Sequence, residues 1–322
     1  MSFGDEAPDV YAGAKAKGWK QLWLRHQLSL LSGAALLVLA LGAYHLFSDG
    51  DFSFLMTLGS LLVLFAFGLL VLKVALTRKV RNLSLKTLQC YALVFAARLC
   101  SILRYEGYLP YDRSGDWFYK ATEVCALALV VGLIACTLGP FRTSYQAQAA
   151  ADNKLTLPGL PSWAGALVLA VPALLVAGLL HPNLNGNFLT DTAWAFALYL
   201  ESVAILPQIM LFQGGGSAGG GAGGGGRSGG GGGGGVEEIE PLEANFVFCL
   251  AVARAMHLVF WASSFHELND KGPDAAVHRR FPGHFVVIAQ ALNLIVMADF
   301  VWFYIVAARA KKGVILPVSL QV

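Results

Sequence analysis

Three ionisable side chains lie in apolar stretches, where a charged group is costly. Glu201 stands near the middle of WAFALYLESVAILPQ, Arg98 lies in LVFAARLCSIL, and Arg254 lies in FCLAVARAMHLVFW. In a bilayer, a lone charge costs about 2.5–3.5 kcal/mol on insertion scales, unless it faces protein or water and finds a partner. We therefore expect these three groups to meet inside a helix bundle, and their meeting point is the candidate site.

The composition is that of a polytopic helical membrane protein. Of the 322 residues, 56% are hydrophobic and 13% are charged, which excludes an ordinary soluble domain. The formal net charge of +3 gives no reason to expect a nucleic-acid partner. The cysteines lack metal-ligand spacing, and no nucleophile–base pair emerges. We therefore expect no enzyme, no metal site and no cofactor.

Eight apolar runs are long enough to cross a bilayer as helices. Their continuity argues against a barrel, whose strands are about 10 residues long and alternate in polarity. The predicted spans are residues 28–47, 52–76, 84–103, 117–138, 161–180, 188–212, 244–265 and 284–308. We expect an all-α membrane protein with these spans.

Lysine and arginine residues in the loops predict the orientation. Most of them lie on the side of the N-terminal head, residues 1–27, which carries Lys15, Lys17, Lys20 and Arg25. The loops on the opposite side hold fewer cations. With eight spans, both termini are therefore predicted to lie in the cytosol.

A glycine-rich run, residues 214–235, separates the sixth and seventh spans. Such a run buries no apolar area, so it predicts a flexible cytosolic linker. A phosphate-binding glycine loop is the alternative. That alternative is disfavoured because no strand precedes the run and no Lys-Ser/Thr pair ends it.

Four phrases resemble the ER lumen protein-retaining receptors, the KDEL receptor family. They are YLESVAILPQ at 199–208, SLKTLQCYALVFAARL at 84–99, ANFVFCLAVARAMHLVFW at 244–261 and ADFVWFYIVAARAKKGVILP at 298–317. The similarity covers roughly residues 55–320 without the glycine insert. The added first span, with Arg98-Leu99 and Val252-Ala253-Arg254, resembles the divergent receptor-like branch described from plants.

The resemblance implies a fold of seven helices. Two three-helix bundles are joined by one linking helix, as in the SWEET sugar transporters. Spans two to four and six to eight would form the bundles, and span five would link them. The receptor-like domain would occupy residues 52–312, with span 28–47 as an addition and residues 313–322 as a cytosolic tail.

The resemblance also implies a ligand and a site. Family members bind luminal proteins that end in a KDEL-like tetrapeptide, in a cavity that opens to the lumen. They bind in the mildly acidic Golgi and release in the neutral ER. The matching positions assign ligand-binding roles to Arg98, Asp191, Trp194, Glu201, Arg254 and Trp261. Among these, Glu201 and Arg254 would be an ion pair that locks spans six and seven, and Arg98 would help to draw in the peptide carboxylate.

The matching positions near the C-terminus imply roles in trafficking. Asp299 corresponds to an acidic residue linked to trafficking of the occupied receptor, and Lys311 and Lys312 fall in the tail that resembles a coat-binding end. The implied partners are luminal proteins with KDEL-like C-termini, coat proteins and membrane lipid. The implied location is the membranes of the ER and the Golgi.

Several pocket groups of the family are absent from this chain. The arginine and the histidine of the first pocket helix fall near Met56 and Val63, and the second carboxylate-binding arginine falls at Ser264. The tyrosines expected beside the two helix arginines are replaced by Leu99 and Ala253.

Two hypotheses follow. The chain is a receptor for KDEL- or HDEL-like tetrapeptides in Golgi-to-ER retrieval, or it kept the scaffold, lost tetrapeptide binding and became a small-solute transporter or a structural membrane protein. Similarity of scaffold alone does not decide between them. In the first case, His257 and His266 are candidate pH sensors, although a structural role is the alternative for each.

Overall fold

The computed structural model describes residues 53–104, 116–156, 161–184, 186–214, 239–269 and 281–310, and Val314. The predicted span 28–47, the head 1–27, nearly all of the glycine-rich run, Lys311 and Lys312 lie outside these residues. So does the tail 313–322, apart from Val314.

The described part of the chain is built from helices, with one isolated antiparallel bridge between Ile239 and Val314. The longer helices are α2 (Ser53–Thr77), α3 (Leu85–Ile102), α4 (Asp116–Leu138), α7 (Leu167–Leu179), α8 (Phe188–Val203), α9 (Leu206–Gly214), α10 (Pro241–Ser264) and α11 (Pro282–Ala310). The short ones are α5 (Arg142–Gln146), α6 (Ala149–Asp152) and the 3₁₀ turns η1 (Asn153–Leu155), η2 (Ser162–Ala166) and η4 (Phe265–Leu268). Among the described residues, six stretches are long and apolar enough to cross a membrane, with α8 and α9 counted together. The prediction of a polytopic helical membrane protein is confirmed.

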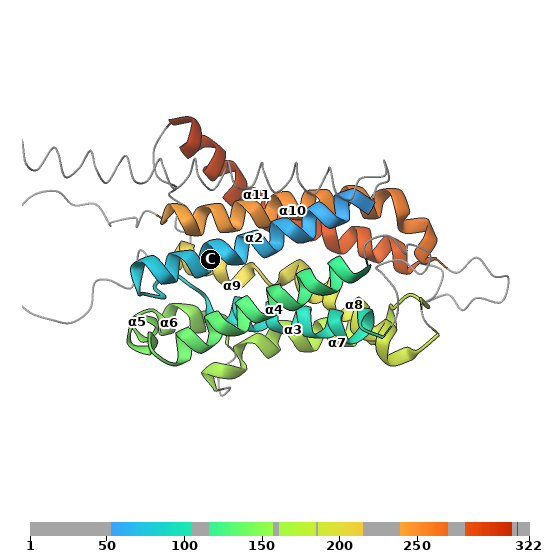
Figure 1. Cartoon of the computed structure of the whole chain (residues 1–322), viewed down its shortest axis with the longest axis horizontal. Helices are drawn as coiled ribbons and strands as arrows, with labels where there is room; N and C mark the ends of the chain where they lie inside the picture. Colours follow the sequence, from blue (N-terminus) through green and yellow to red (C-terminus); the bar gives the residue numbers. More distant parts are fainter. Residues whose placement is uncertain are drawn as a thin grey trace, which may run out of the picture.

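The helices form two triplets with the same internal arrangement (Figure 1). In the first triplet, α4 packs against both α2 and α3; in the second, α11 packs against both α8 and α10. Between the triplets, α2 packs against α10 and α3 packs against α8, while α7 packs against α8. The first helix of each triplet thus packs against the second helix of the other triplet. Such pairing is expected for two repeats that are related by an axis along the membrane normal.

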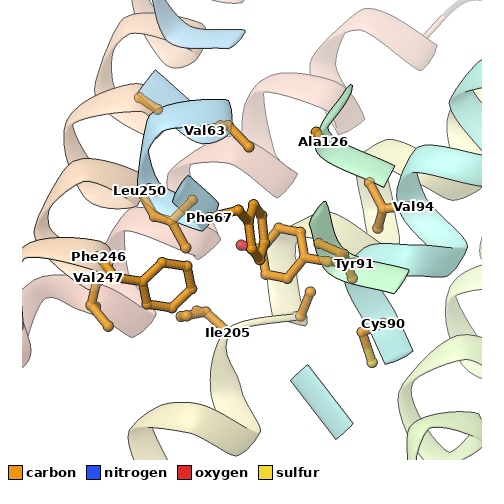
Figure 2. Packing of buried hydrophobic residues seen from close by; sticks show 14 of the residues in the cluster. Val63, Phe67, Cys90, Tyr91, Val94, Ala126, Ile205, Phe246, Val247 and Leu250 are labelled. Atoms are coloured by element: carbon orange, nitrogen blue, oxygen red, sulfur yellow. The ribbon is translucent and has the colours of Figure 1, made fainter. Parts of the chain in front are cut away.

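Phe67 of α2 lies where the two triplets meet (Figure 2). Its ring centroid is 5.0 Å from that of Tyr91, 5.7 Å from that of Phe95 and 5.4 Å from that of Phe246. These rings come from α3 and α10, and all of them are buried. In a bilayer, close packing rather than escape from water holds helices together, and edge-to-face aromatic pairs add about 0.5–1.5 kcal/mol each. Phe67 therefore joins the first triplet to the second.

The predicted sixth span, residues 188–212, is not one continuous helix. It is interrupted at residues 204–205, between α8 and α9. Pro207 explains the interruption, because it lacks an N–H for the carbonyl four residues earlier and its ring clashes with that carbonyl. Asn293 of α11 compensates by donating from Nδ2 to the carbonyl oxygens of Glu201 and Ser202, at 2.9 and 2.8 Å.

The first prediction concerns the contact between α2 and α10. A Cβ atom at Gly59 would lie 2.3 Å from Nε2 of His257, whereas one at Gly68 on the same helix would meet nothing within 4 Å. We expect Gly59→Ala to destabilise the protein by about 1–3 kcal/mol, the usual cost of overpacking. Gly68→Ala should be neutral or stabilising, because alanine is the better helix former. Thermal unfolding in detergent, followed by size-exclusion chromatography, measures both. Equal behaviour of the two variants would contradict the close approach.

Candidate ligand-binding site

The structure brings Arg98, Glu201 and Arg254 together from three helices. Nη2 of Arg98 on α3 lies 2.5 Å from Oε2 of Glu201 on α8. The other carboxylate oxygen, Oε1, lies 2.5 Å from Nη2 of Arg254 on α10. Each oxygen of one carboxylate thus serves a different guanidinium group, and Glu201 bridges two arginines that belong to different triplets.

The chain of contacts continues at both ends. Nη1 of Arg98 lies 2.8 Å from Oε1 of Glu123 on α4. Nη1 of Arg254 lies 3.1 Å from Nδ1 of His257. Arginine can only donate, so Nδ1 of His257 is the acceptor and the imidazole is neutral in this arrangement. All five side chains are buried, with exposed fractions of 4% or less.

Burial strengthens the contacts of this ionic chain, but it also raises the cost of leaving any of its charges without a partner. The two guanidinium groups and two carboxylates balance in formal charge. In a low dielectric, their hydrogen bonds strengthen one another, while any unpaired member would be costly. Replacing a whole buried ion pair by apolar groups can be neutral, but removal of one partner costs about 3–5 kcal/mol. The arrangement therefore holds α3, α4, α8 and α10 in one register.

An aromatic pair lies beyond the ionic chain along α8 and α10. Trp194 precedes Glu201 by seven residues, and Trp261 follows Arg254 by seven residues. Seven residues are about two helical turns, or about 10 Å, so both tryptophans lie on the faces that carry the charges. Their rings meet edge to face, with centroids 5.6 Å apart. Asp191, one turn before Trp194, is buried on the same side of α8.

The remaining predicted site residue within the described part lies elsewhere. Asp299 is exposed on α11. At the positions where the family's pocket groups are missing, Met56, Leu99, Ala253 and Ser264 are all buried. Arg98 is consequently enclosed by protein and held by two carboxylates, rather than facing open solvent.

A second polar cluster holds the loop between α2 and α3. Asp152 accepts from the hydroxyls of Ser84 and Tyr145, at 2.5 and 2.7 Å. Gln208 donates to the carbonyl of Asn82 at 2.7 Å and accepts from the backbone N–H of Ser84 at 2.9 Å. Burial and the adjacent Asp152 carboxylate raise the pKa of Tyr145, so its hydroxyl remains a donor at neutral pH. Gln208, the last residue of the phrase at 199–208, therefore has an architectural role.

The second prediction tests the central carboxylate. Glu201→Gln should destabilise the protein by about 3–5 kcal/mol, because it leaves Arg98 and Arg254 without the charge that both contact. Asp299→Asn, a matched change at an exposed carboxylate of another membrane-spanning helix, should leave stability nearly unchanged. Thermal unfolding in the same detergent compares the two variants. A smaller loss for Glu201→Gln than for Asp299→Asn would refute the central role of Glu201.

Comparisons with known proteins agree with this architecture. Residues 79–219 match the family model described as ER lumen protein retaining receptor. An ER lumen protein-retaining receptor of Caenorhabditis elegans is 25% identical over 258 residues, which is 79% of this chain and 94% of the relative. ER lumen protein-retaining receptor 2 of Danio rerio is 24% identical over 262 residues, and that of Homo sapiens is 27% identical over 263 residues. Each of these two alignments covers 80% of this chain and 96% of the relative.

Proposed function

We propose that this chain, which belongs to the ER lumen protein-retaining receptor family, is a receptor for KDEL- or HDEL-like C-terminal tetrapeptides. It would act in ER and Golgi membranes, in the retrieval of luminal proteins from the Golgi to the ER. The observation that carries the proposal is the buried contact of Arg98, Glu201 and Arg254 within a sequence that aligns with almost the whole length of such receptors.

The site has the chemistry that a peptide with a free C-terminus requires. A guanidinium group in a low dielectric forms strong, charge-assisted hydrogen bonds with a carboxylate. Arg98 would receive the terminal carboxylate of the peptide, and Glu201 with Arg254 would hold α8 and α10 around it. Trp194 and Trp261 would provide an apolar wall, and Asp191 an anionic group for the basic part of the ligand.

The orientation and the trafficking contacts complete the proposal. The loop charges favour cytosolic termini, so the Trp194–Trp261 end of the bundle would face the lumen. Asp299, exposed on α11, would contribute to trafficking of the occupied receptor through contacts with lipid or a neighbouring protein. Lys311 and Lys312 would bind coat proteins in the cytosol.

The third prediction tests ligand binding directly. The purified protein should bind a synthetic peptide ending in KDEL or HDEL more tightly at pH about 5.5 than at pH about 7.4, values that bracket histidine titration. Arg98→Lys keeps the charge but loses the planar fork, so it should weaken binding by about tenfold or more. Isothermal titration calorimetry or microscale thermophoresis measures both effects.

The control for this experiment is the same peptide with an amidated C-terminus, which should bind far more weakly. Wild-type and variant proteins are first compared by size-exclusion chromatography, so that loss of fold is not mistaken for loss of binding. If the wild-type protein binds neither peptide at either pH, the receptor proposal is wrong. Solute uptake into proteoliposomes would then support a transporter instead.

A further inference from the structure

We propose that Glu123 is a built-in competitor of the ligand carboxylate for Arg98, and thereby sets how tightly this chain binds its peptide. The inference rests on the proposed function, because it concerns the same site. Neither the phrases that resemble the receptor family nor the residues assigned from them include Glu123.

The geometry places Glu123 directly on the proposed ligand-binding group. Arg98 presents Nη2 to Glu201 at 2.5 Å and Nη1 to Glu123 at 2.8 Å. Glu201 also contacts Arg254 and so has a structural task. Glu123 comes from α4, the central helix of the first triplet, and its exposed fraction is 2%. A side-chain carboxylate thus already makes the contact that a peptide C-terminus would make.

Charge balance explains why the two carboxylates compete. Arg98 and Arg254 are balanced by Glu123 and Glu201, and all four side chains are buried. A third carboxylate from a peptide would add one negative charge to this set, and like charges in a desolvated site disfavour each other strongly. The peptide carboxylate must therefore displace Glu123 from Arg98 before it gains the full contact.

The position of Glu123 suits such an exchange. It lies seven residues after the start of α4, and Arg98 lies four residues before the end of α3. These helix ends belong to the same side of the bundle, because α4 follows α3 as the next membrane crossing. Both groups are therefore within about 10 Å, measured along their helices, of the side from which the ligand is proposed to enter.

The experiment compares peptide affinity in three proteins. Glu123→Gln removes the competing charge but keeps the size of the side chain, and should bind a KDEL or HDEL peptide about tenfold more tightly or better, the scale of one charged hydrogen bond. The amidated peptide should show no such gain. Glu243→Gln is the matched control, since Glu243 is equally buried and pairs with Lys73 at 2.6 Å, near the start of α10. It should not tighten binding.

The possible outcomes separate the inference from the function on which it rests. Binding by the wild-type protein without a gain in Glu123→Gln overturns the inference alone. Binding by wild type with a gain in Glu123→Gln supports the inference. Binding by Glu123→Gln alone would support the competition but overturn the receptor function of the natural chain, and binding by neither protein overturns both. If Glu123→Gln is not recovered as a folded protein, Glu123→Asp decides instead, because its carboxylate is one methylene farther from Arg98. An affinity of Glu123→Asp no higher than that of wild type would then overturn the inference.

Discussion

The structure depends on one carboxylate that is shared between two guanidinium groups. Glu201 is buried at membrane depth, where its charge is costly unless cationic partners compensate it. Those partners, Arg98 and Arg254, come from different triplets, so satisfying Glu201 also sets how the triplets face each other. Phe67 and the rings around it then pack the space between the same helices. The fold and the site are therefore consequences of the same electrostatic requirement.

Much of this arrangement could be predicted from the sequence, because membranes impose simple rules. Long apolar runs must be helices, and the boundaries of α3 and α10 lie close to those expected. The cost of an isolated charge predicts that Glu201 meets Arg98 and Arg254. The heptad spacing of Trp194 and Trp261 from these charges is visible once the helices are known to be antiparallel. Both tryptophans are related to the charged residues by helical periodicity, and this periodicity can be read directly from the sequence.

Other features depend on contacts between distant helices, which no local pattern reveals. Glu123 resembles an ordinary polar residue near a helix start, and only the packing of α4 on α3 shows that it contacts Arg98. Histidine is the residue type expected of a pH sensor. In this structure, however, Arg254 donates a hydrogen bond to Nδ1 of His257, so this imidazole is neutral. Pro207 signals the break after α8 in the sequence. No sequence pattern indicates that Asn293 donates to the carbonyl of Glu201 at this break. A proton switch at His257 would therefore require this contact with Arg254 to break, because a protonated Nδ1 can no longer accept.

The interruption between α8 and α9 has a mechanical consequence. Asn293 donates a hydrogen bond to the backbone carbonyl of Glu201. The residue that contacts both arginines is therefore also connected, through its backbone, to α11. Any displacement of the Glu201 side chain that moves its peptide group must stretch or break this amide contact. Helix α11 carries Asp299 and runs to Ala310, close to the chain terminus. A change in the ionic centre that moves this peptide group would therefore be transmitted through the Asn293 contact to α11.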